Sequence, residues 1–454
     1  MAASIIDPQR DYKSKTPKSM KLYSKAVNVF AGGINHNIRF FEPYPFFVKR
    51  SAGKKLYDVD GNAYTDYWMG HWALILGHSP RPVIKALSDQ IAIGTMYGTA
   101  NNLSVQHGEL IQKLMPSAER LRFSNTGSEA TMYAIRLARA YSRKKVVAKV
   151  IGGWHGFNTP LMHTVNFPFE LKEGLGLLHE DSQYIESLPF NDLEGSIKTL
   201  NSIRKDIACI ITEPLLGTAG CIPAQNDYLR GLQEYANKND IVFILDEIVT
   251  GFRLSIRGAA HLYNLKPDLF TLGKIAGGGL PIGVLCGKKE IMSLIDPVAR
   301  QTKERLCLVG GGTFSANPMT MSAGYATLSH IRNNESRLYS RINNLGKKAR
   351  DELTKLFSDA KIRVQITGVG SLFMLHFLND KVGKIVNALD VALSNKELLK
   401  LYHLSLISRY GIFFLPLKMG AFSEAHSDAD VKRLISATQE IINSRLLSRT
   451  VDNS

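Results

Sequence analysis

The feature that most constrains the fold of this chain is a set of short, continuous apolar runs that alternate with longer helical patterns. The runs, each bounded by polar residues or glycine, are Val146–Val150, Ile207–Thr212, and residues 241–245 and 282–287. Strands that are buried on both faces have this composition. Helical patterns at residues 128–143 and 227–239 lie between the runs. The alternation predicts an α/β fold with a mostly parallel sheet, whose ligand site lies at the carboxyl ends of the strands.

The texture of the sequence changes near residue 325. Long charged helical stretches follow, then VQITGVGSLFMLHF and GIFFLPL as strands, and an S-x-x-D pattern at Ser427 and Asp430 that begins a last helix. The chain has 454 residues, and hydrophobic cores stop growing at roughly 250–300 residues. We predict an N-terminal segment with a β-hairpin (residues 1–66), a large α/β domain (67–325) and a small α+β domain (326–454).

Composition limits the class of protein. The chain is 44% hydrophobic and 21% charged, which is ordinary for a globular protein. Its net charge of +16 suits acidic ligands, but its basic residues are scattered, so we expect no nucleic-acid partner. Apolar runs fall short of the roughly 18 residues of a membrane-spanning helix, and the four cysteines show no metal-ligand spacing. We expect a cytoplasmic protein without a metal site or a membrane anchor.

An acid and a lysine follow neighbouring predicted strands. Asp246 comes after the run IVFIL, and Lys274 comes after the run LFTLG. One strand–helix–strand unit separates them, so adjacent strand ends would place a carboxylate and an amine in one pocket. A desolvated lysine has a lowered pKa and can supply a neutral amine for a Schiff base. Taken alone, Asp246 is equally well explained as a cap of the turn that follows it.

Loops after two other strands supply further groups. In FSNTGSEA, Gly127 permits close approach of the backbone, Ser128 offers a hydroxyl, and the start of the helix attracts an anion. Trp154 follows Val146–Val150 in a glycine-rich turn and offers a flat ring. Their ordinary alternatives are a helix cap and a core aromatic. Together, a phosphate cradle, a stacking ring, a carboxylate and a strand-end lysine predict a site for pyridoxal 5'-phosphate.

A series of ordered motifs carries a resemblance to a known family. From about Gly32 to the C-terminus, the chain resembles the class III aminotransferases, which are pyridoxal-phosphate-dependent enzymes of fold type I. The motifs are GGINHNIR, LYDVDGNAYTDY, GHWALILGH, SNTGSEATMYAIRLAR, WHG, ITEPLLG, LDEIVTGFR, PDLFTLGKIAGGGLPIG and GGTFSANP. Within the family, the chain is most similar to the glutamate-1-semialdehyde 2,1-aminomutases, with some resemblance to β-amino acid transaminases.

The resemblance implies which residues bind the cofactor. They are Gly127, Ser128, Trp154, Asp246, Ile248, Lys274 and Thr313. Lys274 is the Schiff-base lysine and Asp246 the partner of the pyridine nitrogen, so both are catalytic. The remaining residues hold the phosphate or pack on the faces of the ring.

The same resemblance implies a shared site and a substrate contact. Thr313 would reach the phosphate of the neighbouring subunit, which implies a homodimer with shared active sites. Arg39 matches an arginine that binds a substrate carboxylate, and Trp72 matches a tryptophan that walls the pocket. A polar, glycine-containing stretch at residues 158–181 predicts a loop that closes over the site.

Several substrate positions depart from the aminomutase pattern. His36 replaces a serine, Ile151 an acid and Thr218 an asparagine, and Lys418 stands near the position of a late glutamate. We therefore predict an enzyme that transfers an amino group between an amino acid, with β- and ω-amino acids as candidates, and an oxo acid. One alternative is the aminomutase, an isomerase that makes 5-aminolevulinate. The other is a non-catalytic relative that binds the cofactor, against which the pairing of a strand-end lysine with an acid argues.

Overall fold

The computed structural model describes residues 7–170, 174–298 and 307–447. Its internal contacts divide the chain into two compact units. The first unit spans residues 1–80, 340–385 and 393–454, and the second spans residues 81–339 and 386–392. The N-terminal segment therefore belongs to the same unit as the C-terminal region, whereas the sequence pattern predicts separate segments at 1–66 and 326–454.

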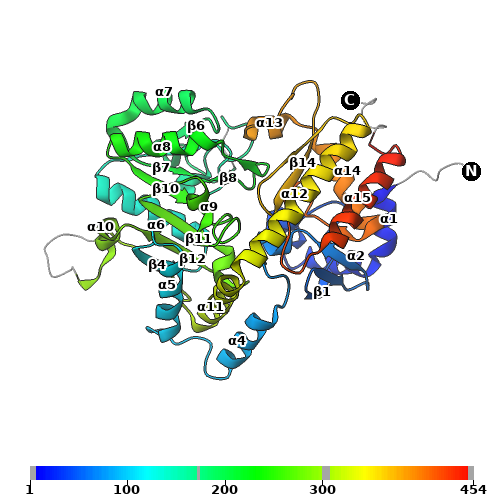
Figure 1. The fold of residues 1–454 in the computed structure, drawn as a ribbon, viewed down its shortest axis with the longest axis horizontal. Coiled ribbons are helices and arrows are strands. Elements are labelled where there is room, and N and C mark those ends of the chain that lie inside the picture. Colours follow the sequence, from blue (N-terminus) through cyan, green and yellow to red (C-terminus); the bar gives the residue numbers. More distant parts are fainter. Residues whose placement is uncertain (1–6, 171–173, 299–306, 448–454) are drawn as a thin grey trace, which may run out of the picture. The chain divides into compact units, whose positions relative to one another are not determined.

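The second unit is built on a seven-stranded sheet, drawn from cyan to yellow-green in Figure 1. Within the described residues, its strands in spatial order are β4 (Arg120–Ser124), β12 (Gly283–Gly287), β11 (Leu269–Gly273), β10 (Val242–Asp246), β7 (Ile207–Thr212), β5 (Val146–Val150) and β6 (Ile185–Leu188). The pairs from β11 to β6 are parallel, and β12 runs antiparallel to both of its neighbours. The mostly parallel sheet predicted from the sequence is confirmed.

Burial explains the continuous apolar runs of this sheet. Every residue of β7, β10, β11 and β12 is buried. The helix α6 (Gly127–Ser142) covers part of the sheet, where its residues Ala134 and Leu137 share a core with Cys209 and Ile244. Strands that are covered in this way have no solvated face and need no alternating polar residues.

Other elements of the second unit connect and cover these strands. The helices are α4 (Arg81–Ile91), α5 (Asn102–Leu114), α7 (Leu193–Ile203), α8 (Asn226–Lys238), α9 (Gly258–Leu262), α10 (Lys289–Met292), α11 (Pro318–Asn333) and most of α13 (Ala388–Leu393). Shorter turns are η3 (Thr159–Met162), η4 (Glu180–Ser182), η5 (Arg204–Asp206), η6 (Lys274–Gly277) and η7 (Ser293–Ile295). A small antiparallel ribbon pairs β8 (Leu215–Leu216) with β9 (Ile222–Pro223).

The first unit combines segments from both ends of the chain. Its four-stranded sheet has the order β1 (Val48–Ala52), β2 (Lys55–Asp58), β3 (Ala63–Asp66) and β15 (Ile412–Phe413), and its smaller sheet has the order β13 (Val364–Thr367), β14 (Leu372–Phe377) and β16 (Gly420–Ala421). The hairpin expected in YDVDGNAYTDY is the antiparallel pair β2–β3. Because β15 pairs in parallel with β3, the hairpin belongs to the same sheet as a C-terminal strand.

Helices of the first unit come from both ends as well. They are α1 (Pro8–Lys15), α2 (Pro17–Ala26), α14 (Lys396–Tyr410), α15 (Asp428–Asn443) and the greater part of α12 (Glu335–Asp359). Shorter turns are η1 (Ala31–Gly33), η2 (Asn37–Arg39) and α3 (Met69–Trp72).

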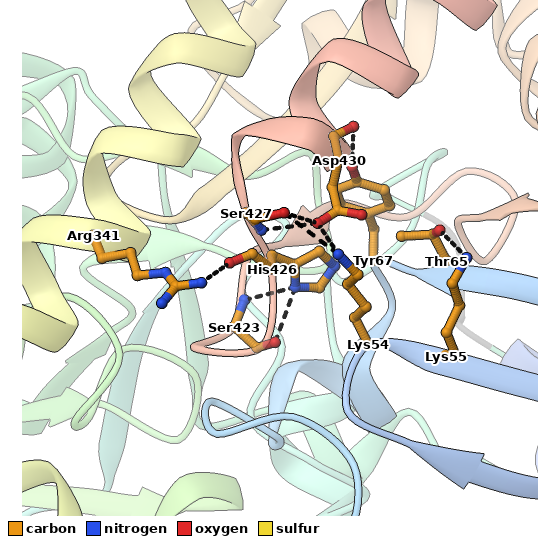
Figure 2. A network of polar contacts seen from close by, with 9 residues as sticks. All are labelled: Lys54, Lys55, Thr65, Tyr67, Arg341, Ser423, His426, Ser427 and Asp430. Atoms are coloured by element: carbon orange, nitrogen blue, oxygen red, sulfur yellow. Dashed lines mark hydrogen bonds and ion pairs between the residues drawn. The ribbon is translucent and has the colours of Figure 1, made fainter.

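The predicted start of the last helix is confirmed, and it also joins the two ends of the chain. The Asp430 carboxylate accepts hydrogen bonds from the backbone N–H and the hydroxyl of Ser427, at 2.8 and 2.9 Å. It also pairs with the Lys54 amine at 2.5 Å, and the Tyr67 hydroxyl donates to the Asp430 carbonyl at 3.0 Å (Figure 2). Lys54 and Tyr67 flank the hairpin strands, so these contacts connect the hairpin to α15.

Two further sequence expectations concern a membrane-spanning helix and a closing loop. Among the described residues, no helix is both long enough and apolar enough to cross a bilayer. Residues 171–173 of the loop predicted to close over the site lie outside the described residues, and the closing of that loop stays a prediction.

Candidate active site

Asp246 and Lys274 follow neighbouring strands of the parallel sheet. Asp246 is the last residue of β10 and lies in register with Thr271 of β11, and Lys274 follows the end of β11 directly. The backbone of Lys274 has a φ of +46°, a left-handed conformation that costs a non-glycine residue roughly 1–2 kcal/mol. Such strain persists where the surroundings over-determine the conformation, and it clusters at functional sites.

Asp246 is 3% exposed, and its carboxylate makes three polar contacts. Its Oδ1 accepts hydrogen bonds from the Thr271 hydroxyl at 2.8 Å and from the Ile248 N–H at 3.1 Å. Its Oδ2 lies 2.7 Å from Nδ1 of His155. Asp246 therefore does cap the turn after β10, and it pairs with a buried imidazole as well.

The motif pattern assigns no role to His155, which the structure places in the site. The residue is 1% exposed, and burial lowers the pKa of its imidazole despite the opposing charge of Asp246. A neutral ring whose Nδ1 faces a carboxylate carries its proton on Nδ1 and donates it. The Thr131 hydroxyl donates to the His155 carbonyl at 2.6 Å and so fixes the backbone. His155 and Thr271 together orient the Asp246 carboxylate.

Electrostatics at Lys274 favour the neutral amine. Burial lowers the pKa of the Lys274 amine, and the carboxylates of Asp246 and Glu213 oppose this effect more weakly. Burial raises the pKa of Glu213 to about 8, with a further contribution from the charge of Asp246. The Glu213 carboxylate accepts hydrogen bonds from the N–H groups of Trp154 and Gly217, at 2.9 and 3.2 Å. A lowered lysine pKa increases the fraction of the nucleophilic, uncharged form.

The start of α6 offers backbone donors to an anion. The Thr126 hydroxyl accepts from the Glu129 N–H at 3.2 Å, and the Glu129 carboxylate accepts from the N–H groups of Asn125 and Thr126. The next N–H groups, of Gly127 and Ser128, have no acceptor within the helix because they lie in its first turn. Together with the helix dipole, they form an arrangement suited to a phosphate.

The turn after β5 packs onto this helix start. Gly156 has a φ of +83°, and a Cβ there would lie 2.2 Å from the Ser128 hydroxyl oxygen. The Phe157 N–H donates to the same oxygen at 3.0 Å. Trp154 is half-buried in this turn, with its ring edge-on to Phe157 at 4.9 Å. The absence of a side chain at Gly156 thus permits the close approach of the turn to Ser128.

Ile248 fills the space between the helix start and β11. A Cβ at Gly127 would lie 2.9 Å from Ile248 Cδ1, and a Cβ at Gly273 would lie 3.0 Å from the same atom. The structure therefore brings together, within one unit, six of the seven residues to which the resemblance assigns cofactor binding.

Thr313 also belongs to this unit but is exposed. It lies in a turn whose Gly311 carbonyl accepts a hydrogen bond from the Asn125 side chain at 3.0 Å. Its predicted contact with a neighbouring subunit stays a prediction.

Arg39 and Trp72 belong to the first unit. Arg39 is exposed at the end of η2. Trp72 is 2% exposed, and its indole N–H donates to the Met419 carbonyl at 2.8 Å. Their roles in substrate binding stay predictions.

Comparison with known proteins decides the family. Residues 40–399 match the family described as aminotransferase class-III. The chain belongs to the class III aminotransferases. It is an enzyme of this pyridoxal-phosphate-dependent family, and its α/β architecture is consistent with fold type I.

Individual relatives differ in their described reactions. The chain is 36% identical to the glutamate-1-semialdehyde 2,1-aminomutase of Archaeoglobus fulgidus, over 94% of this chain and 99% of that protein. Among solved structures, it is 28% identical to a β-phenylalanine aminotransferase from Variovorax paradoxus, with a TM-score of 0.85 and coverage of 97% and 96%. It is also 28% identical to a transaminase with pyridoxal phosphate bound, with a TM-score of 0.86 and coverage of 95% and 99%.

Proposed function

We propose that this enzyme binds pyridoxal 5'-phosphate and transfers an amino group between an amino acid and an oxo acid. The observation that carries the proposal is the buried Asp246–His155 pair at the end of β10, in the same unit as the strained Lys274 and the start of α6. A carboxylate, an amine and an anion site are the donor set that this cofactor requires.

The residues present fit the cofactor. The N–H groups of Gly127 and Ser128 would hold its phosphate, the Asp246 carboxylate its pyridine nitrogen, and the Lys274 amine its aldehyde. When bound, pyridoxal phosphate supplies an aldehyde that reacts with amines and a ring that withdraws electrons from the substrate carbon.

Three side chains of the protein carry out proton transfer, charge stabilisation and orientation. Lys274 accepts a proton from the substrate carbon at Nζ and delivers it again. Its lowered pKa favours the unprotonated amine that can accept this proton, and it eases the later release. Asp246 stabilises the positive charge on the ring nitrogen. His155 keeps the Asp246 carboxylate oriented through the 2.7 Å contact.

Transfer to a second substrate is preferred because polar positions of the aminomutase pattern have changed. Ile151, directly after β5, is apolar where that pattern has an acid, and Thr218 stands in place of an asparagine. These changes remove groups that would retain a second amine, so the amino group leaves on another molecule. The similarity to a β-phenylalanine aminotransferase supports β-amino acids as donors.

The aminomutase reaction is the second candidate. It is favoured by the 36% identity to the Archaeoglobus fulgidus aminomutase over nearly the whole chain. In that reaction, glutamate-1-semialdehyde is converted to 5-aminolevulinate with no external acceptor.

Dependence on an acceptor separates the two candidates. We expect the loaded enzyme to sustain more than one turnover with a β-amino acid donor only when 2-oxoglutarate or another oxo acid is added, because the amino group must leave on a second substrate. The measurement is product formation per active site, with and without acceptor, for β-amino acids and for glutamate-1-semialdehyde. Sustained formation of 5-aminolevulinate without an acceptor would favour the aminomutase instead.

Arg39→Lys tests the proposed carboxylate contact. Arginine binds a carboxylate through a planar pair of donors, a geometry that lysine lacks. We expect the KM of the carboxylate substrate to rise about tenfold or more, as for a lost charge-assisted hydrogen bond, with an unchanged spectrum of the bound cofactor. Arg10→Lys, at an exposed position on α1, is the matched control. An unchanged KM in the Arg39 variant would exclude this contact.

A shared site is also part of the proposal. The hydroxyl of Thr313 would contact the phosphate bound in the partner subunit of a homodimer. Its exposure in the chain leaves it accessible for such a contact.

A further inference from the structure

A left-handed turn follows the hairpin in the first unit. Met69, Gly70, His71 and Trp72 have φ values of +45°, +59°, +59° and +65°. Residues with a side chain adopt this conformation at a steric cost and normally do so singly. Glycine, which avoids the cost, occupies one of these positions. The turn is therefore held by its surroundings, and such strain is an indicator of function.

Asp66 and His78 clamp the entry to the turn. Oδ1 of Asp66 accepts the N–H groups of Trp68 and Met69 at 2.8 and 3.1 Å. Oδ2 of Asp66 lies 2.7 Å from Nε2 of His78. Asp66 is 1% exposed, so these contacts form away from competing water.

The exit of the turn and its base are fixed as well. The Trp72 N–H donates to the Trp68 carbonyl at 2.9 Å, and the Trp72 indole donates to the Met419 carbonyl at 2.8 Å. Tyr67, next to Asp66, is anchored through its hydroxyl to the carbonyl of Asp430 (Figure 2). The clamp thus acts on a turn whose two ends are already held.

The turn presents His71 to the loop that carries Arg39. The His71 ring lies 5.5 Å from the ring of His36, with 34° between their planes. His36 in turn caps η2, because its Nδ1 accepts the Ile38 N–H at 3.4 Å. Arg39 ends this short element and forms no ion pair with any described residue. Asp66 thus holds the backbone of the turn that carries His71, the His71 ring lies next to His36, and His36 caps the short element that ends at the exposed Arg39.

We propose that Asp66 and His78 are positioning residues that hold the Met69–Trp72 turn left-handed, so that His71 and His36 orient Arg39 toward a carboxylate. The inference rests on the proposed function, in which Arg39 binds the carboxylate of the amino acid substrate. The ligand class is a carboxylic acid. The contacts of Asp66 offset the steric cost of the left-handed turn. The turn in return fixes the position of one donor group.

The pair His78→Ala and His78→Gln tests the clamp. Alanine removes the donor to Asp66, whereas the glutamine amide can place a donor where Nε2 of the histidine lies. We measure single turnovers of the loaded enzyme, by cofactor absorbance, with 3-aminobutanoate and with 2-aminobutane, which has a methyl group in place of the carboxylate. His261→Ala, at an exposed histidine, is the control.

In the His78→Ala variant, the apparent Kd of 3-aminobutanoate should rise about tenfold, as for the loss of one charge-assisted hydrogen bond. Its limiting rate and the reaction of 2-aminobutane should be unchanged, and His78→Gln should restore the Kd. Equal weakening of both donors, or no weakening, would overturn the inference. Should His78→Ala not fold, Asp66→Asn, which keeps one acceptor oxygen, should give a smaller increase in the same Kd.

Binding of propionate provides a readout that is independent of amino transfer. The Trp68 ring lies 4.4 Å from the His71 ring and 4.8 Å from the Trp72 ring, so tryptophan fluorescence is the proposed readout of carboxylate binding. The Kd of propionate should rise in His78→Ala and recover in His78→Gln, whether or not the enzyme uses either amine. If the wild-type enzyme bound propionate in this way but processed neither donor, the proposed function would fail and the positioning role would stand. A propionate Kd that is the same in all variants would refute that role.

Discussion

Replacing Lys274 with alanine should abolish multiple turnover while leaving the fold intact. The Lys274 amine is proposed both to link to the cofactor aldehyde and to move the substrate proton, so alanine removes both roles at once. Loss of a general base lowers rates by about 10²–10⁴-fold. Loss of the amine that forms the link adds to this effect, so we expect at least about a 10³-fold decrease in kcat.

Borohydride trapping gives this prediction a chemical readout. In the wild-type enzyme, reduction should fix the cofactor to Lys274, which peptide mass spectrometry would locate. Lys266→Ala removes an exposed lysine shortly before the same strand and should change neither trapping nor turnover. Trapping at another lysine, or near-normal turnover in Lys274→Ala, would contradict the assignment.

The sheet was predictable because its strands are buried on both faces. Runs such as IACIIT in β7 are apolar up to their last residue, Thr212, and a strand of that kind requires covered faces. The direction of β10 and β11 then follows from the helix between them, which places Asp246 and Lys274 at the same edge. Local composition and chain direction were therefore enough to predict that Asp246 and Lys274 lie at the same edge of the sheet.

The partners of Asp246 were less accessible to prediction. His155 reaches Asp246 across 91 positions of the chain, and nothing in WHG distinguishes a histidine that bonds a carboxylate from one that packs in a core. The order of β5, β7 and β10 in the sheet makes this contact, and that order is a property of the tertiary structure. The signal that could have identified His155 is its position after a strand of the same sheet.

The two ends of the chain are joined by strands that are too short to be recognised in the sequence. β15 consists of Ile412 and Phe413 alone, and its parallel pairing with β3 brings a C-terminal strand to the hairpin. A pair of apolar residues shows no periodicity from which a strand could be predicted.

The left-handed turn at Met69–Trp72 could not be predicted from the sequence either, because three of its residues are types that favour negative φ. Surrounding contacts, led by the Asp66 carboxylate, override that local preference.

Asp246→Asn should fold and bind the cofactor but react far more slowly. The amide preserves the shape of the side chain, and its oxygen can still accept from Thr271 and the Ile248 N–H. It carries no negative charge, so it cannot stabilise a protonated ring nitrogen, and the cofactor loses much of its capacity to withdraw electrons. Removing one preorganised electrostatic contact of this kind lowers kcat by about 10²–10³-fold.

Asp240→Asn is the matched control, since it removes the same charge from an exposed residue just before the other end of β10. Stopped-flow absorbance of the loaded enzymes, with cofactor content measured separately, distinguishes a slow reaction from poor binding. A normal rate in Asp246→Asn at full cofactor occupancy would mean that the ring nitrogen needs no carboxylate. The buried His155–Asp246 contact would then have a structural role alone. A slow reaction at full occupancy, with normal rates in the control, would place the defect at the electrostatic contact that Asp246 makes from the end of its strand.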